Sequence, residues 1–171
     1  MMTRDLVHGA VSGALATVAM SAAMVAGDQA GMMKGGHPPK HIARAVLPGH
    51  KRRPKPGEGV LGAVAHMGFG AAAGALFAMI ADGGRARVSR GVAYGLTIWV
   101  VSYQGWVPRL GILPPVHRDH PERQTVMAAA HVVYGAALVL ALNRLRSRAT
   151  AKASQPSSPM PLPAGEAIPA H

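Results

Sequence analysis

Hydrophobic positions gather into four stretches that contain no Lys, Arg, Asp, Glu or Pro. These stretches are residues 6–27, 59–81, 91–107 and 125–142. A helix needs roughly 17 to 25 residues to cross the hydrocarbon core of a bilayer, so each stretch is long enough. Every proline of the chain lies outside them, as expected where no water can satisfy a broken helix. The pattern predicts four transmembrane helices with these bounds.

Three features of the first half of the chain recur in the second half, in the same order. The matching pairs are Gly9-x3-Gly13 with Gly91-x3-Gly95, Pro38-Pro39-x-His41 with Pro114-Pro115-x-His117, and His66-x3-Gly70 with His131-x3-Gly135. Ordered agreement of this kind favours duplication of a helix–loop–helix unit. We therefore expect an all-α fold over residues 1–146: a four-transmembrane-helix bundle built from two duplicated helical hairpins, related by an axis along the membrane normal.

Composition supports a membrane class. The chain is 49% hydrophobic and only 15% charged, whereas a soluble domain carries about 25% charged residues. It has no cysteine, which excludes disulfides, zinc–thiolate sites, iron–sulfur clusters and a cysteine nucleophile. A cleaved secretory signal is the alternative for residues 6–27, but that apolar run exceeds the roughly 7 to 15 residues typical of a signal.

The formal charge of +11 comes from 18 Lys and Arg against 7 Asp and Glu. Anionic lipid headgroups attract such residues at about 1 kcal/mol each, so nucleic-acid binding is not needed to explain the charge. The density of basic residues favours cytoplasmic termini, although the raw count, spread over two longer loops, favours the reverse. After the last stretch the chain becomes proline-rich, and residues 147–171 are expected to be a disordered tail.

Glycines repeat at helical spacing along the predicted helices, where they permit close backbone approach between helices in lipid. The expected packing positions are Gly9, Gly13, Gly62, Gly70, Gly74, Gly91, Gly95 and Gly135. Small-residue rows on more than one helix also leave open a homo-oligomer or another membrane protein as partner.

His66 and His131 are the candidate functional pair. Each lies on a small-residue row of its helix, so both rings should point into the bundle. A structural role is one interpretation, since a hydrogen bond between membrane helices is worth about 0.6 kcal/mol on average. Proton- or ion-coupled permeation is the alternative, because histidine titrates near neutral pH. A transition metal or haem between the two rings is a further alternative, but we expect no metal and no cofactor.

Catalysis is not expected. No Gly-x-Ser-x-Gly elbow and no phosphate-binding glycine loop is present. Asp119 and Glu122 flank His120, but such groups in a loop are usually solvated. The function expected from these residues is binding or structural.

The element Pro108-x2-Gly111-x2-Pro114-Pro115, together with His66 and His131-x3-Gly135, resembles the YagU-type family of small inner-membrane proteins. The likeness covers about residues 59–143. It implies a multi-pass protein of the bacterial inner membrane with no catalytic residues to transfer. The candidate loop motif comprises Pro38, Pro39, His41, Pro108, Gly111, Pro114, Pro115 and His117.

Overall fold

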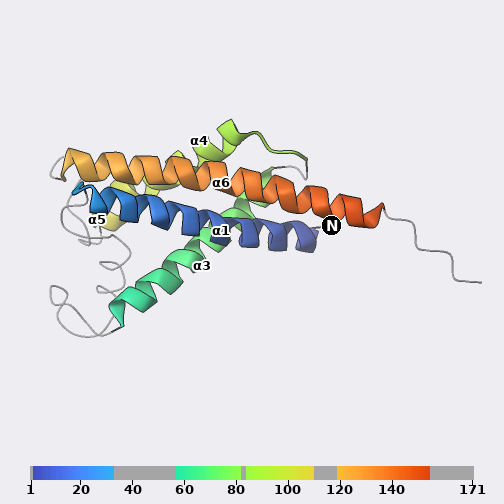
Figure 1. Cartoon of the computed structure of the whole chain (residues 1–171), viewed down its shortest axis with the longest axis horizontal. Helices are drawn as coiled ribbons and strands as arrows, with labels where there is room; N and C mark the ends of the chain where they lie inside the picture. Colours follow the sequence, from blue (N-terminus) through green and yellow to red (C-terminus); the bar gives the residue numbers. More distant parts are fainter. Residues whose placement is uncertain (1, 33–56, 82–83, 110–118, 155–171) are drawn as a thin grey trace, which may run out of the picture.

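The computed structural model describes residues 2–32, 57–81, 84–109 and 119–154. The elements, in chain order, are α1 (Met2–Gln29), α3 (Glu58–Ile80), α4 (Val88–Trp99), the π-helix η1 (Val100–Trp106), α5 (Val107–Arg109) and α6 (Pro121–Ala153). Every regular element within these ranges is helical, which confirms the all-α class (Figure 1).

Three helices are long and apolar enough to cross a membrane. They cover Thr3–Gln29, Gly59–Ile80 and Pro121–Ala153. Each contains one of the stretches predicted from the sequence almost completely. The predicted bounds 6–27 and 59–81 therefore lie close to the observed helix bounds. The other two predicted helices, 91–107 and 125–142, differ from the structure in helix type and in length.

The third predicted helix, 91–107, is not a single α-helix. The 12 residues of α4 pass into the seven-residue π-helix η1 and then into α5. The Val107 amide hydrogen-bonds to the Ser102 carbonyl five residues earlier, which is π-helical spacing. The Ser102 hydroxyl also donates to the Ile98 carbonyl at 2.7 Å. Such side-chain bonds compete with the regular backbone ladder.

The fourth predicted helix, 125–142, is much longer in the structure, where α6 spans Pro121–Ala153. Proline suits the first turn because its missing amide would have no partner there. Residues 147–153 are helical, so the predicted disordered tail begins too early. Beyond Leu142 the chain stops being apolar, but its Arg and Ala residues are good helix formers. Residues 155–171 lie outside the described residues.

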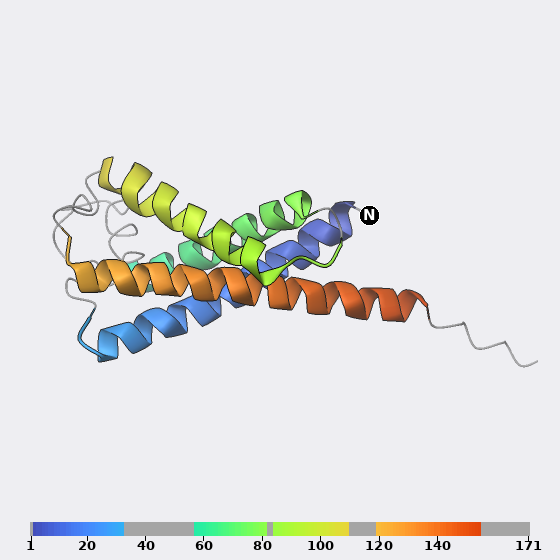
Figure 2. The same ribbon diagram turned by 90° about the horizontal axis from the view of Figure 1, so that it is seen from above.

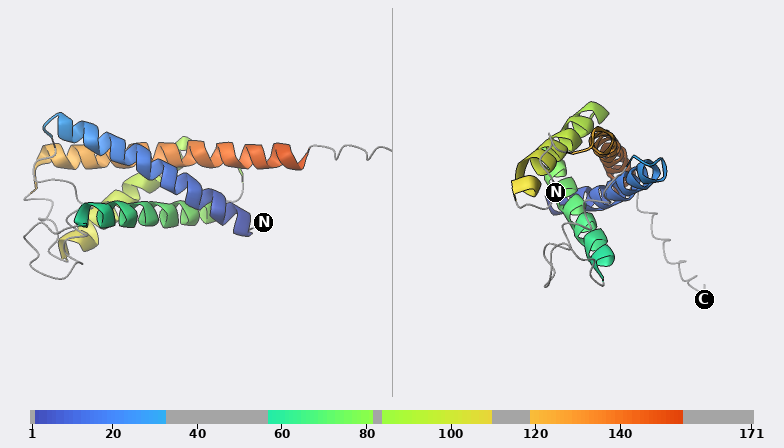
Figure 3. Two further views of the ribbon diagram at one scale, coloured as in Figure 1. Left: turned by 60° about the horizontal axis from the view of Figure 1, so that its bottom comes forward. Right: turned by 90° about the vertical axis from the view of Figure 1, so that its left-hand side faces the viewer.

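The helices pack in adjacent pairs. α1 contacts both α3 and α6, and α4 contacts α6. Figure 2 shows α1 crossing α6, and the right-hand view of Figure 3, which looks roughly along α6, shows α1 running obliquely to it. α3 and α6 diverge towards the end at which both begin, whereas η1 and α5 turn away from α6 at that end (Figures 1 and 2). The molecule is therefore more open at that end.

Glycines make the closest helix contacts. A methyl group at Gly13 of α1 would collide with the Gly70 carbonyl of α3, and one at Gly9 would lie 2.5 Å from the Gly74 carbonyl oxygen. Space for such a group is equally absent at Gly91, which faces Gly135. Backbone approach this close accounts for the glycine rows on both helix pairs.

The two helix pairs cross in different registers. In the first pair the second glycine of the α1 motif, Gly13, faces Gly70. In the second pair the first glycine of the α4 motif, Gly91, faces Gly135, and Gly95 faces the His131 carbonyl. The expected match of Gly9-x3-Gly13 with Gly91-x3-Gly95 is therefore displaced by one helical turn.

Arg146 ties the helices together at the end where α1 starts. Its guanidinium donates to the Asp5 carboxylate at 3.1 Å, to the Gly84 carbonyl at 2.8 Å and to the Ala78 carbonyl at 3.2 Å. One turn earlier on α6, Asn143 both donates to the Ala86 carbonyl and accepts from its amide, at 2.9 and 3.0 Å. These bonds anchor the part of α6 that extends past the predicted end.

Candidate functional site

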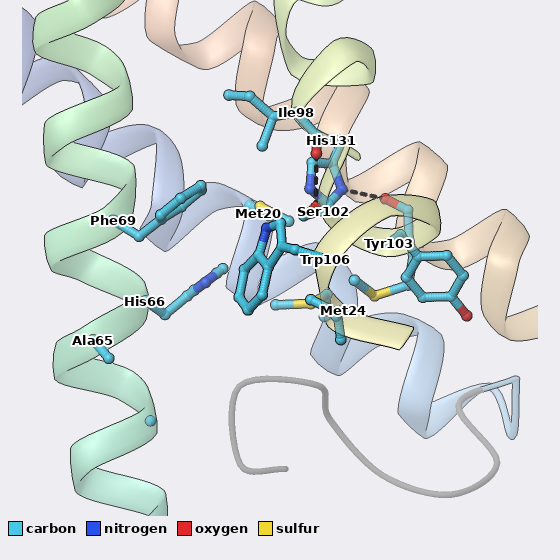
Figure 4. Close-up of a pocket in the computed structure, with 13 residues that line it drawn as sticks. Met20, Met24, Ala65, His66, Phe69, Ile98, Ser102, Tyr103, Trp106 and His131 are labelled. Carbon is cyan, nitrogen blue, oxygen red and sulfur yellow. Dashed lines mark hydrogen bonds between the residues drawn. The ribbon is translucent and has the colours of Figure 1, made fainter. Parts of the chain in front are cut away.

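A cavity of about 240 Å³ lies between α1, α3, η1 and α6, at the end where the helices diverge. Met20 and Met24 line it from α1, while Ala65 and Phe69 line it from α3 (Figure 4). Phe69 is 50% exposed and Trp106, from η1, is 39% exposed. The cavity therefore reaches the surface of the protein between α3 and η1.

The π-helix supplies one wall of the cavity through Ser102, Tyr103 and Trp106. Tyr103 is buried and stacks on Trp99, with ring centroids 6.0 Å apart. Its hydroxyl has no hydrogen-bond partner among the described residues. π-Helical turns are rare and occur frequently at functional sites, so the irregular element and the cavity coincide as expected for a site.

Both candidate histidines line this cavity. His131 is 6% exposed, and its Nδ1–H donates to the Met127 carbonyl at 2.7 Å. A carbonyl can only accept, so the proton lies on Nδ1 and Nε2 carries the lone pair of the neutral ring. His66 projects from α3 towards Trp106 and the α1 methionines (Figure 4). Its buried Nε2 has no partner among the described residues.

Two tyrosines, which the sequence analysis did not consider, hold α3 to the second helix pair. The Tyr134 hydroxyl donates to the Gly70 carbonyl at 2.9 Å, and the Tyr94 hydroxyl donates to the Ala73 carbonyl at 2.8 Å. Tyr134 directly precedes Gly135 in the His131-x3-Gly135 motif. The sequence therefore already indicated that Tyr134 lies near the face of α6 that carries His131 and Gly135. These bonds fix the depth of α3, and hence of His66, against α6.

The remaining predicted positions divide into three groups. Gly62 lies in the cavity wall, whereas the other predicted packing glycines lie at helix contacts. Pro108 lies within α5 and is half-buried. The rest of the candidate loop motif lies outside the described residues, namely Pro38, Pro39, His41, Gly111, Pro114, Pro115 and His117.

Asp119 is not solvated, contrary to the expectation for this loop. It is 7% exposed and forms a buried ion pair with Arg123, whose Nε donates to Oδ2 at 3.1 Å. Its other carboxylate oxygen accepts from the His120 amide at 2.9 Å. A carboxylate at the start of α6 also complements the helix dipole. The role of Asp119 is thus to organise the start of α6.

Among the described ranges, no group of three or more His, Cys, Asp or Glu side chains could hold a metal ion. No described carboxylate lines the cavity. Its chemistry is therefore that of two imidazoles in a largely apolar wall of thioethers and aromatic rings.

Comparison with known protein families identifies the family of the chain. The model of a family of unknown function, DUF6789, covers residues 3–153. No curated protein and no solved structure matches the chain. The match does not confirm the resemblance to YagU-type proteins.

Proposed function

Because this chain belongs to the DUF6789 family, whose function is unknown, we propose its function from the cavity: it is a non-catalytic membrane protein that binds a small ligand between α1, α3, η1 and α6. The observation that carries this proposal is that one cavity collects both buried imidazoles. Protein interiors are close-packed, and voids larger than a water molecule are few.

A purely structural role is less well supported by the energetics. The Nε2 atom of His66 is buried without a described partner, and an unsatisfied buried polar group costs about 1–3 kcal/mol. Selection for stability alone would favour an apolar side chain that fills the space. A ligand that bonds to this nitrogen gives the group its partner.

Proton- or ion-coupled permeation also has less support. The cavity walls include no described carboxylate. Further along α6, the core is filled by Leu138, Val139 and Leu142, which have no exposed surface. A permeation path would need a polar route past these side chains.

The proposed topology has four crossings, and α4, η1 and α5 together form the third of them in chain order. The two hairpins are proposed to be copies of one unit, and the membrane is the bacterial inner membrane, as for the YagU-type resemblance. Exposed arginines lie at the end that holds the start of α1: Arg85, Arg87, Arg90, Arg144 and Arg148. Their density favours the cytoplasmic side for this end, next to anionic headgroups.

Cysteine labelling tests whether the cavity is an open site. The chain has no native cysteine, so Ala65→Cys places a single thiol in the cavity wall. Ala63→Cys is the matched control. Ala63 lies on the same helix, two residues closer to its start, and is exposed, but it does not line the cavity. Thiol reagents need a hydrated thiolate, which lipid suppresses.

In vesicles, a small methanethiosulfonate reagent should modify the Ala65→Cys thiol several-fold faster than the Ala63→Cys thiol. Access from the membrane surface alone would give the opposite order, since residue 63 is nearer the start of α3. Equal rates, or a faster reaction at residue 63, would show that lipid or protein fills the cavity and would refute the proposal.

A further inference from the structure

Three of the side chains that line the cavity are methionines. Met20 and Met24 come from α1 and Met127 comes from α6, and each is at most 5% exposed. With the two imidazoles, the cavity therefore brings together three thioether sulfurs and two ring nitrogens from three helices. Thioether and imidazole are the soft and intermediate ligands that select Cu(I).

Spacing and hydrogen bonding arrange these donors. Met20 and Met24 are four residues apart and so share one face of α1. Met127 and His131 have the same spacing on α6, and the His131 Nδ1–H donates to the Met127 carbonyl. Metal-bound histidines generally donate their second N–H to a carbonyl or carboxylate in this way, which fixes the ring and points the other nitrogen at the metal.

The geometry points to a binding site for a soft monovalent cation, Cu(I), held by the methionine sulfurs and the Nε2 atoms of His66 and His131. This inference rests on the proposed binding function and names its ligand. The buried Nε2 of His66, which has no described partner, is the second donor nitrogen of the site.

Charge decides against a divalent ion. Every donor in the cavity is neutral, since no described Asp or Glu lines it and the chain has no cysteine. The cost of moving an ion from water into a medium of low dielectric constant rises with the square of its charge. A monovalent ion with polarizable neutral ligands therefore fits this wall better than Zn²⁺ or Cu²⁺, which favour carboxylate, thiolate or imidazole sets.

Trp106 adds a further contact for a cation. Its indole lies in the cavity wall beside Met24 and His66 (Figure 4). The face of a tryptophan ring attracts a cation within about 6 Å, more strongly where water is absent. Because Trp106 is also partly exposed, it stands where an ion would pass between the cavity and the surface.

The competing interpretation is that the methionines only fill space, which is their common role in cores. Replacing methionine by leucine separates the two, because leucine keeps the apolar volume and removes the sulfur. If the methionines are packing residues, Met→Leu changes should leave ligand binding as it is. If they are ligands, the change should weaken metal binding without unfolding the protein.

The experiment uses the full chain in detergent micelles with Ag(I), a redox-inert soft monovalent ion, as the probe. Trp99→Phe leaves Trp106 as the single tryptophan, since the chain has two. Quenching of Trp106 fluorescence then reports Ag(I) in the cavity, separately from Ag(I) on histidines elsewhere. The test variant is Met20→Leu/Met24→Leu, and the control is Met79→Leu, because Met79 is 56% exposed and does not line the cavity.

We expect saturable quenching by Ag(I) in the Trp99→Phe protein and its Met79→Leu form. The double leucine variant should bind about tenfold or more weakly, with unchanged helix content and thermal midpoint. His131→Ala should also weaken binding. Absence of quenching, or equal quenching in the double leucine variant, would overturn the Cu(I) site. If residue 65 still labels faster than residue 63 in that case, the cavity remains a binding site for a different ligand.

Discussion

Two glycines on α3 provide a sharp test of how the helices are held together. A methyl group at Gly70 would collide with the Thr17 hydroxyl oxygen and would lie 3.1 Å from Thr17 Cβ and 3.3 Å from the Gly13 carbonyl oxygen. A methyl group at Gly68, two residues earlier on the same helix, would meet no atom within 4 Å. Alanine at these positions should therefore have opposite effects on stability.

The expected magnitudes follow from these surroundings. Glycine-to-alanine replacement inside a helix gains about 0.5–1 kcal/mol when nothing opposes it, so Gly68→Ala should raise the free energy of unfolding by that amount. Overpacking costs about 1–3 kcal/mol, which exceeds the same gain at Gly70. Gly70→Ala should therefore lower the free energy of unfolding by about 1–2 kcal/mol.

Thr17 allows a rescue experiment. Its hydroxyl donates to the Gly13 carbonyl at 2.8 Å and holds the oxygen against Gly70. Thr17→Ala removes the hydroxyl oxygen that the new methyl group of Gly70→Ala would meet first. The Cβ atom of residue 17 then remains closest to that methyl group, and a helix shift of a few tenths of an ångström relieves this contact. In the double variant, part of the destabilisation should be recovered relative to the sum of the single changes.

Far-UV circular dichroism during denaturation in mixed micelles measures these free energies. If Gly68→Ala destabilised the protein as much as Gly70→Ala, helix contacts at Gly70 would not be the cause. A double variant no better than the additive sum would likewise refute the assignment of the clash to the Thr17 hydroxyl.

Four further substitutions use the same unfolding assay. His66→Leu should raise the free energy of unfolding by about 1 kcal/mol, because it removes a buried nitrogen without a described partner; a loss of similar size would show a structural role. Asn143→Leu should lower it by about 2 kcal/mol, since the buried Ala86 amide and carbonyl both lose their partner; no change would mean that other groups satisfy them. Arg146→Met should lower it by about 1–2 kcal/mol, because two backbone carbonyls lose a donor. Asp5→Asn should lower it by less than about 1 kcal/mol, because the Asp5 side chain is 35% exposed; equal losses would assign the whole effect to the ion pair.

The positions of the three long helices could be predicted because the signal is strong and local. An apolar run without charge or proline has few alternatives to a membrane helix, and α3 begins and ends within one residue of the predicted bounds. The end of α6 could not be predicted in this way. There the helix continues through arginines, and its anchors, Asp5 and Gly84, are far away in the sequence.

Only some of the residues that line the cavity could be predicted from the sequence. A histidine in an apolar helix is conspicuous, so His66 and His131 could be selected from the sequence. Methionine in the same context looks like any other core residue, although Met20-x3-Met24 and Met127-x3-His131 carried the spacing of a shared face. Which face opens depends on where the helices diverge and on the π-helix at Val100–Trp106, and neither has a local sequence signature.

Both imidazoles lie one helical turn beyond a glycine contact, and this explains why the cavity forms where it does. His66 precedes Gly70 by four residues on α3, and His131 precedes Gly135 by four residues on α6. The glycine contacts, together with the Tyr134 bond to Gly70, hold the helix axes close at one level. From that level towards the starts of α3 and α6 the helices separate (Figure 1), and longer side chains from α1 and η1 reach into the widening space. The glycine contacts and the Tyr134 bond therefore fix the positions of both histidines relative to each other. A substitution that shifts the crossing should change the distance between the imidazoles without touching either ring.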